Sequence, residues 1–294
     1  MGYVNKNIYF FIISPSLHIM FLQNNIICGI MQKSIHNRKG VIILNIAIIT
    51  GASSGLGEQF ALKVDRLTDV DEIWLIARRK EKLQELSKTL GKKTRILPLD
   101  LTNQKDLEEF SLTLKNENPN IQLLINNAGY GKLGNFEDIS CSDNTGMIKL
   151  NCEALTAVTS ISLPFMSENS EIINSCSIAS FAPNTRMAVY SSTKAFVMSF
   201  SRALRAELKN RKINVLAVCP GPMDTEFLSL AGIEKGASHT FDTLPRVNPE
   251  KVAEKSLLAS RKKKAVYTNR LFYKFYRVLA KILPHSLVMK LAGT

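Results

Sequence analysis

The feature that most constrains the fold of this chain is a regular alternation that begins near residue 43. Short apolar runs rich in β-branched residues alternate from there with longer stretches whose apolar residues recur at helical spacing. Continuous apolar strands are buried on both faces, which is typical of a parallel sheet covered by helices. We therefore expect a single doubly wound α/β domain of the Rossmann-like type. The composition, 45% hydrophobic and 21% charged, suits such a globular domain.

The expected strands are Ile43–Thr50, Glu72–Ala77, Thr94–Leu99, Gln122–Asn126, Glu171–Ser175, Ile213–Cys219 and Ala265–Tyr267. The expected helices include Gly57–Arg66, Lys80–Leu90, Gln104–Asn116 and Ser191–Asn210. We see no internal repeat and no interdomain linker. The carboxyl ends of the strands in such a sheet carry the functional loops.

The net charge of +13 comes from the two ends of the chain. Residues 1–44 carry four basic side chains and residues 261–294 carry nine, and neither segment has an acid. These thirteen charges account for the whole net charge, so residues 45–260 are neutral overall. A neutral folded domain argues against nucleic-acid binding. The five cysteines are widely spaced and the four histidines are scattered. We therefore expect a reduced, cytoplasmic protein without a metal site.

The N-terminal extension, residues 1–44, is unlike the rest of the sequence. Its apolar run at residues 8–14 is too short and too broken for a membrane span, and no small-residue cleavage pattern follows it. One interpretation of residues 1–44 is a signal peptide or a membrane anchor. The other is that translation starts at Leu44, read from a TTG codon, in which case an intact-mass measurement would find residues 1–43 missing.

A glycine-rich turn follows the first expected strand and opens a helix. Its glycines allow a tight turn and close approach of a pyrophosphate to the helix N-terminus. The cofactor-binding residues expected here are Gly51, Ser53, Ser54, Gly55, Leu56 and Gly57. A turn without any ligand is the plainer reading.

The same segment also fits the G-x-S-x-G elbow of a serine hydrolase, with Ser53 as nucleophile and His239 and His285 downstream. That elbow usually follows several strands, whereas this turn follows the first. The hydrolase reading also leaves the motifs below unexplained, so we regard it as a remote alternative.

Four motifs together resemble those of the short-chain dehydrogenase/reductase family over residues 43–268. They are the glycine turn, Asn126-Asn127-Ala128-Gly129, Tyr190-Ser191-Ser192-Thr193-Lys194 and Pro220-Gly221. The resemblance implies a dinucleotide-binding catalytic domain over residues 45–268, and it implies the catalytic residues Asn151, Ser177, Tyr190 and Lys194. Ser177 has the family's usual separation from Tyr190, which Ser175 and Ser180 do not.

The chemistry of these residue types agrees with that assignment. Tyr190 and Lys194 are four residues apart on a helix, so they project from one face. An ammonium about 4 Å from a phenolate stabilises the ionised form by roughly 4 kcal/mol, so we expect Lys194 to lower the pKa of Tyr190 toward neutrality. Ser177 would polarise the reacting carbonyl. Asn151 would hold a proton-relaying water, or else simply bond a break in a helix backbone.

The second strand indicates which nicotinamide cofactor binds. An acid after that strand accepts hydrogen bonds from a ribose 2′-hydroxyl, whereas this chain has Arg78 and Arg79, which suit a 2′-phosphate. We therefore expect NADP(H) in preference to NAD(H), unless these are ordinary solvated charges. The resemblance adds further cofactor-binding positions at Asp100, Leu101, Asn127, Ala128, Gly129, Pro220, Gly221 and Thr225, besides Tyr190 and Lys194.

The expected function is hydride transfer between NADP(H) and a carbonyl or alcohol. An apolar segment between Met223 and Val247 suggests an apolar substrate, or merely packs on the body. The alternative function is a silent dinucleotide-binding sensor or scaffold. The C-terminal tail, residues 269–294, contains a basic amphipathic helix, which would contact a membrane through residues 270–283, cap the substrate cleft or join subunits. We expect a homo-oligomer.

Overall fold

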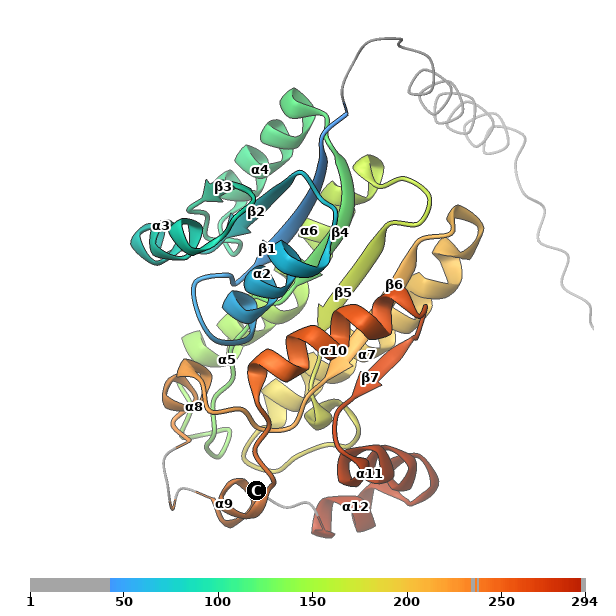
Figure 1. The fold of residues 1–294 in the computed structure, drawn as a ribbon. Helices are drawn as coiled ribbons and strands as arrows, with labels where there is room; N and C mark the ends of the chain where they lie inside the picture. The colour runs from blue at the N-terminus through green and yellow to red at the C-terminus, as the bar shows by residue number, and fades with distance from the viewer. Residues whose placement is uncertain (1–42, 234–235, 237, 292–294) are drawn as a thin grey trace, which may run out of the picture. The chain divides into compact units, whose positions relative to one another are not determined.

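The computed structural model describes residues 43–233, 236 and 238–291, so nearly all of the N-terminal extension lies outside the described residues. Within them, seven parallel strands form one sheet in the order β3-β2-β1-β4-β5-β6-β7 (Figure 1). The strands are β1 (Asn45–Thr50), β2 (Glu72–Ile76), β3 (Lys93–Leu97), β4 (Asn120–Asn126), β5 (Glu171–Ser175), β6 (Asn214–Cys219) and β7 (Val266–Thr268). The expected doubly wound parallel sheet is confirmed.

Helices cover both faces of this sheet. One layer contains α2 (Gly55–Leu67), α3 (Lys80–Thr89) and α10 (Pro249–Arg261), and the other contains α4 (Gln104–Glu117), α6 (Leu155–Ser162) and α7 (Ala188–Glu207). Side chains of β1 alternate between the two layers, because successive residues of a strand point to opposite faces. Ala47 and Ile49 pack with the first layer, whereas Ile46 and Ile48 pack with the second.

Strand order reverses beside β1, where the chain returns from the sheet edge at β3 to form β4. Loops leaving β1 and β4 diverge there, which opens a crevice at their carboxyl ends. The glycine turn follows β1, and the Asn126–Gly129 turn follows β4. The topology thus brings two predicted motifs to one place.

Most element boundaries lie within a few residues of the expected ones. The third strand ends earlier than expected, at Leu97, because Pro98 has no N–H to continue the ladder. Helix α7 begins at Ala188, three residues before the expected start, so it includes Tyr190.

The remaining described elements were not expected in detail. They are α5 (Cys141–Ile148), η1 (Lys149–Ala154), η2 (Leu163–Phe165), η3 (Ile178–Ser180), η4 (Leu208–Arg211), α8 (Glu226–Leu230), α9 (His239–Thr243), α11 (Leu271–Ile282) and α12 (His285–Leu291). Helix α11 is the amphipathic helix predicted in the C-terminal tail. None of the described helices combines the length and the apolar composition that crossing a membrane requires.

Candidate active site

The glycine turn has the backbone that its sequence predicts. Gly51 and Gly55 adopt positive φ angles of 67° and 56°, which residues with a Cβ rarely adopt. A Cβ on Gly57 would lie 2.0 Å from the carbonyl oxygen of Gly51, so glycine lets α2 start directly against the turn. The backbone of the turn is therefore exposed toward the crevice at the N-terminus of a helix, where anions bind.

The turn after β4 is tied to the glycine turn by hydrogen bonds. The hydroxyl of Thr50 accepts from the backbone N–H groups of Asn127 and Ala128, at 3.0 Å each. The Asn127 side chain donates to the carbonyl oxygen of Gly51 at 3.3 Å and accepts from Ser175 at 3.1 Å. These contacts hold the carboxyl ends of β1, β4 and β5 in fixed positions around the crevice.

Three of the four predicted catalytic residues meet at the floor of this crevice. Tyr190 and Lys194 lie on α7, and Ser177 follows β5; all three are buried. The Lys194 Nζ donates to the carbonyl oxygen of Ser175 at 2.8 Å and lies 5.7 Å from the centroid of the Tyr190 ring. A tyrosine, a serine and a lysine from two elements thus share one site.

The pKa of Tyr190 differs from our expectation. Burial raises this pKa, while a hydrogen bond with Ser177 lowers it by less. Burial also lowers the pKa of Lys194. The expected lowering by Lys194 is wrong for this structure, because burial of the phenol dominates its pKa. The Lys194 ammonium donates to the carbonyl of Ser175. Tyr190 is consequently a protonated donor at neutral pH.

Asn151 lies behind the crevice, in the π-helical segment η1, and is fully buried. Its amide donates to the carbonyl oxygen of Tyr130 at 2.8 Å and to the Thr193 hydroxyl at 3.0 Å, and its Oδ1 accepts from the Tyr130 N–H at 3.0 Å. Asn151 thus bonds the backbone of the loop after β4, whereas the alternative reading given above expected it to bond a break in a helix backbone. These contacts position the loop after β4 against α7, and π-helical segments are frequent at functional sites.

A large cavity of about 1170 Å³ follows the carboxyl edge of the sheet. Of the predicted site residues, all but Gly57 and Asn151 line it. Gly57 lies just inside α2 and Asn151 lies beneath the wall. A nicotinamide dinucleotide fits this lining, because the exposed glycine backbone and the arginines after β2 suit its phosphates and the buried tyrosine lies farther along the same cavity.

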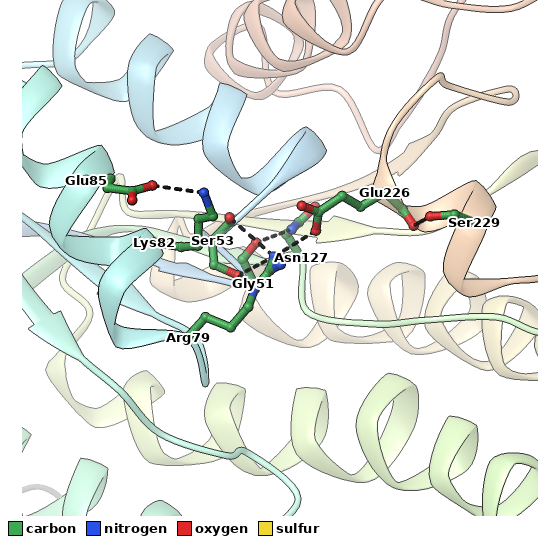
Figure 2. A network of polar contacts seen from close by, with 8 residues as sticks. All are labelled: Gly51, Ser53, Arg79, Lys82, Glu85, Asn127, Glu226 and Ser229. Carbon is green, nitrogen blue, oxygen red and sulfur yellow. Dashed lines mark hydrogen bonds and ion pairs between the residues drawn. The ribbon is translucent and has the colours of Figure 1, made fainter.

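The arginines after β2 are both exposed, and they differ in their contacts. Among the described residues Arg78 has no ion-pair partner. Arg79 donates to the Ser53 hydroxyl from Nε at 3.3 Å and from Nη2 at 3.1 Å, and it forms an ion pair with Glu226 at 2.8 Å (Figure 2). The hydrogen bond from Arg79 lowers the pKa of Glu226, so the carboxylate is ionised at neutral pH. Glu226 is the first residue of α8. The ion pair with Arg79 therefore connects the arginines after β2 to the apolar segment between Met223 and Val247.

The contacts of Ser53 disfavour the hydrolase alternative. A nucleophilic serine needs a neighbouring base that takes its proton. The side chain that bonds the Ser53 hydroxyl is Arg79, whose guanidinium stays protonated and cannot accept a proton.

The far end of the cavity is apolar, and two segments of the chain line it. The expected segment contributes Phe227, Leu228, Leu230, Phe241 and Leu244. The C-terminal helices add Phe272, Tyr273, Phe275, Tyr276, Leu279, Leu283 and Val288. Capping of the cleft, one of three readings of the tail, is therefore what the structure shows.

Gly221 explains how the tail reaches the cavity. A Cβ on Gly221 would lie 2.3 Å from the ring of Tyr273, and the Gly221 N–H donates to Asn269 at 3.1 Å. The Tyr273 hydroxyl donates to the carbonyl oxygen of Pro245 at 2.8 Å, and its side chain is completely buried. The Pro220-Gly221 motif thus also docks α11, which a search for cofactor motifs alone does not reveal.

Known proteins resemble this chain over most of its length. A family model described as short chain dehydrogenase matches residues 45–234. An NADP-dependent 3-hydroxy acid dehydrogenase of Schizosaccharomyces pombe is 33% identical over 237 residues, which are 77% of this chain and 91% of that protein.

Solved structures show the same fold. A short-chain dehydrogenase from Sphingobium yanoikuyae in complex with NADPH is 32% identical, with a TM-score of 0.67 over 78% of this chain and 89% of that one. A short chain dehydrogenase/reductase from Burkholderia phymatum in complex with NAD has a TM-score of 0.70 at 20% identity, covering 81% of this chain and 92% of that one. Both cofactor types therefore occur on this fold.

Proposed function

The chain belongs to the short-chain dehydrogenase family and is an oxidoreductase that uses a nicotinamide dinucleotide; from that premise we propose that it interconverts an apolar ketone or aldehyde with its alcohol, using NADP(H). The observation that carries the proposal is the joint burial of Tyr190, Ser177 and Lys194 in one cavity with the glycine turn. A proton donor, a hydrogen-bond donor for a carbonyl and a fixed cation are the groups that carbonyl reduction needs.

When bound, the cofactor supplies or accepts the hydride. The phenol of Tyr190 gives its proton to the substrate oxygen, because burial keeps it protonated. The hydroxyl of Ser177 bonds the same oxygen and stabilises the negative charge that develops there. Lys194, held by the carbonyl of Ser175, would hold the nicotinamide ribose of a bound cofactor. Lys194→Ala is expected to weaken both cofactor binding and turnover.

The preference for NADP(H) is supported by Arg78 and Arg79. Both line the cavity directly after β2, and residues 77–80 contain no acid that could accept from a 2′-hydroxyl. A guanidinium binds phosphate with two parallel, charge-assisted hydrogen bonds. The relatives at 32% and 33% identity, described with NADPH and as NADP-dependent, agree with this preference.

An apolar substrate is supported by the far end of the cavity. Phe227, Phe241, Phe272 and Phe275 contribute aromatic surface there, and Tyr276 adds a further ring. A pocket with one polar end and an otherwise apolar wall fixes the carbonyl by hydrogen bonds and binds the rest by burial of apolar area. A wall that is mainly apolar offers few hydrogen-bond partners to the hydroxyls of a polar substrate such as a sugar.

We also propose a homo-oligomer in the cytoplasm. Exposed apolar side chains at Phe136, Ile148 and Phe196, which are 65%, 51% and 42% exposed, support a subunit contact near α5 and α7. Dependence on a soluble cofactor supports the compartment. Light scattering on the purified protein tests the oligomer, and a monomer would refute it.

The decisive experiment is a panel of ketones and aldehydes assayed with NADPH and followed at the absorbance of the reduced nicotinamide. We expect consumption of NADPH, fastest with bulky apolar carbonyls. Tight NADPH binding with no turnover across the panel would contradict the reductase and favour the sensor or scaffold alternative.

A further inference from the structure

Helix α11 presents an apolar stripe to solvent. Leu271, Phe275, Val278 and Ile282 are 82%, 63%, 49% and 72% exposed. Their spacings of four, three and four residues place all four on one face of the helix. The opposite face packs on the protein through Tyr273 and Ala280, both buried. Helix α11 therefore has two apolar faces: one packs on the protein, and the other, the exposed apolar stripe, is left uncovered by the described residues.

One edge of this stripe is basic. Arg270, Lys274 and Lys281 are exposed on the same side of the helix, and Arg277 is half-buried beside them. Residues 261–294 contain no acid that would neutralise them. The exposed half of α11 thus carries an apolar stripe with a basic edge, which is the composition of a helix that lies in a membrane interface.

The other edge of the stripe borders the cavity. Phe272, Tyr276 and Leu279 line the cavity, and Phe275 belongs both to the stripe and to the cavity lining. The apolar end of the cavity thus adjoins the exposed apolar stripe without an intervening polar segment. A surface against which the stripe docks would also lie at the mouth of the cavity.

The charge of α11 favours an anionic bilayer over a second copy of the chain as the surface that covers the stripe. A second copy of the chain would bring two α11 helices together, each with several cations and no acid, and like charges repel at such a contact. An anionic bilayer attracts the same cations and accepts the stripe among its acyl chains. We propose that α11 is a bilayer-docking helix, which lies on an anionic lipid surface with the stripe inserted.

Docking in this way places the apolar end of the cavity at the acyl chains. Apolar molecules dissolved in the bilayer would reach the cavity past Phe272 and Phe275 without crossing water. This consequence rests on the proposed function, whereas the docking does not. The test therefore measures binding to lipid, in the absence of cofactor and substrate.

The first experiment is sedimentation of the full-length protein with phosphatidylcholine vesicles, with and without phosphatidylglycerol. We expect binding to the anionic vesicles. Leu271→Gln combined with Ile282→Gln, neither in the cavity wall, should weaken it about tenfold or more. Leu112→Gln combined with Leu258→Gln makes the same kind of change at exposed leucines of α4 and α10, which are 56% and 42% exposed, and should leave binding unchanged.

The second experiment tests the charge. Lys274→Glu combined with Lys281→Glu should weaken binding to anionic vesicles by at least about 25-fold, at about fivefold for each basic side chain near the surface. Lys105→Glu combined with Lys115→Glu makes the same change of net charge on α4, where both lysines are exposed. This control pair should bind as the unmodified protein does.

All the variants and controls contain residues 1–42, so any lipid binding by this segment is the same in each. A difference in vesicle binding between variants therefore reports on α11. Equal binding by the α11 variants and their controls would overturn the proposal. A second result would also overturn it. In that result, sedimentation equilibrium shows that the unmodified chain self-associates and that the Leu271→Gln, Ile282→Gln variant does not, while both proteins bind vesicles equally. Loss of folding is checked by circular dichroism and is not expected at positions this exposed.

Discussion

The ion pair between Arg79 and Glu226 leads to a prediction about cofactor affinity. A 2′-phosphate at Arg79 must displace or share the guanidinium that Glu226 now holds at 2.8 Å. Replacing the carboxylate by an amide of the same shape removes this competition and keeps the contacts of Arg79 with Ser53. Glu226→Gln should therefore tighten NADPH binding. Binding of NADH, which has no 2′-phosphate, should not change.

The magnitude follows from the exposure of the pair. The two side chains are 45% and 48% exposed, and ion pairs this exposed contribute about 0.2–1 kcal/mol. Loss of that competing interaction converts to a gain of about 1.4-fold to 5-fold in NADPH affinity. The gain should shrink as salt is added, because salt screens exposed pairs.

The assay is a titration of reduced nicotinamide fluorescence with NADPH and with NADH. Glu85→Gln is a matched control, because Glu85 forms an exposed ion pair with Lys82 at 2.9 Å that does not involve Arg79 (Figure 2). An unchanged or weaker NADPH affinity in Glu226→Gln would refute the competition. An equal gain for NADH would show that the carboxylate acts on the cofactor generally rather than on the 2′-phosphate.

Three further predictions concern cofactor choice, packing and pH. Arg78→Ala with Arg79→Ala should weaken NADPH at least about tenfold and NADH little, by the same titration, since charge-assisted hydrogen bonds are lost only with the phosphate; equal losses would contradict their role. Gly221→Ala should lower the free energy of unfolding in urea by about 1–3 kcal/mol through the clash with α11, whereas Gly91→Ala, whose Cβ would meet its nearest atom at 3.7 Å, should not. Because burial raises the pKa of Tyr190, and oxidation needs this phenol without its proton, the rate of alcohol oxidation should still rise as the pH increases above neutrality; an oxidation rate that has already reached its maximum at neutral pH would disagree.

Much of the fold was predictable because local pattern and topology agree. Runs of β-branched residues define the strands, and parallel strands with right-handed crossovers leave few arrangements. The glycine turn was predictable for a similar reason, since Gly51 and Gly55 occupy backbone conformations that other residues disfavour. These features depend on neighbouring residues in the sequence.

What could not be predicted depends on contacts between distant segments. Spacing placed Tyr190 and Lys194 on one helical face, yet the direction of the Tyr190 pKa shift depends on the burial of its phenol by other segments. The docking of α11 depends on space that Gly221 leaves for Tyr273, two residues far apart in the sequence. The amphipathic pattern indicated a helix, but not which of its faces would line the cavity.

The account depends most on the phenol of Tyr190 as the proton donor, and Tyr190→Phe tests it directly. The change removes only the hydroxyl, so NADPH affinity and thermal unfolding should match those of the unmodified protein. Turnover of the best carbonyl in the panel should fall about 10²–10⁴-fold, the usual contribution of general acid catalysis. A Tyr190→Phe protein that folds, binds NADPH and keeps most of its turnover would contradict the proposed reaction mechanism.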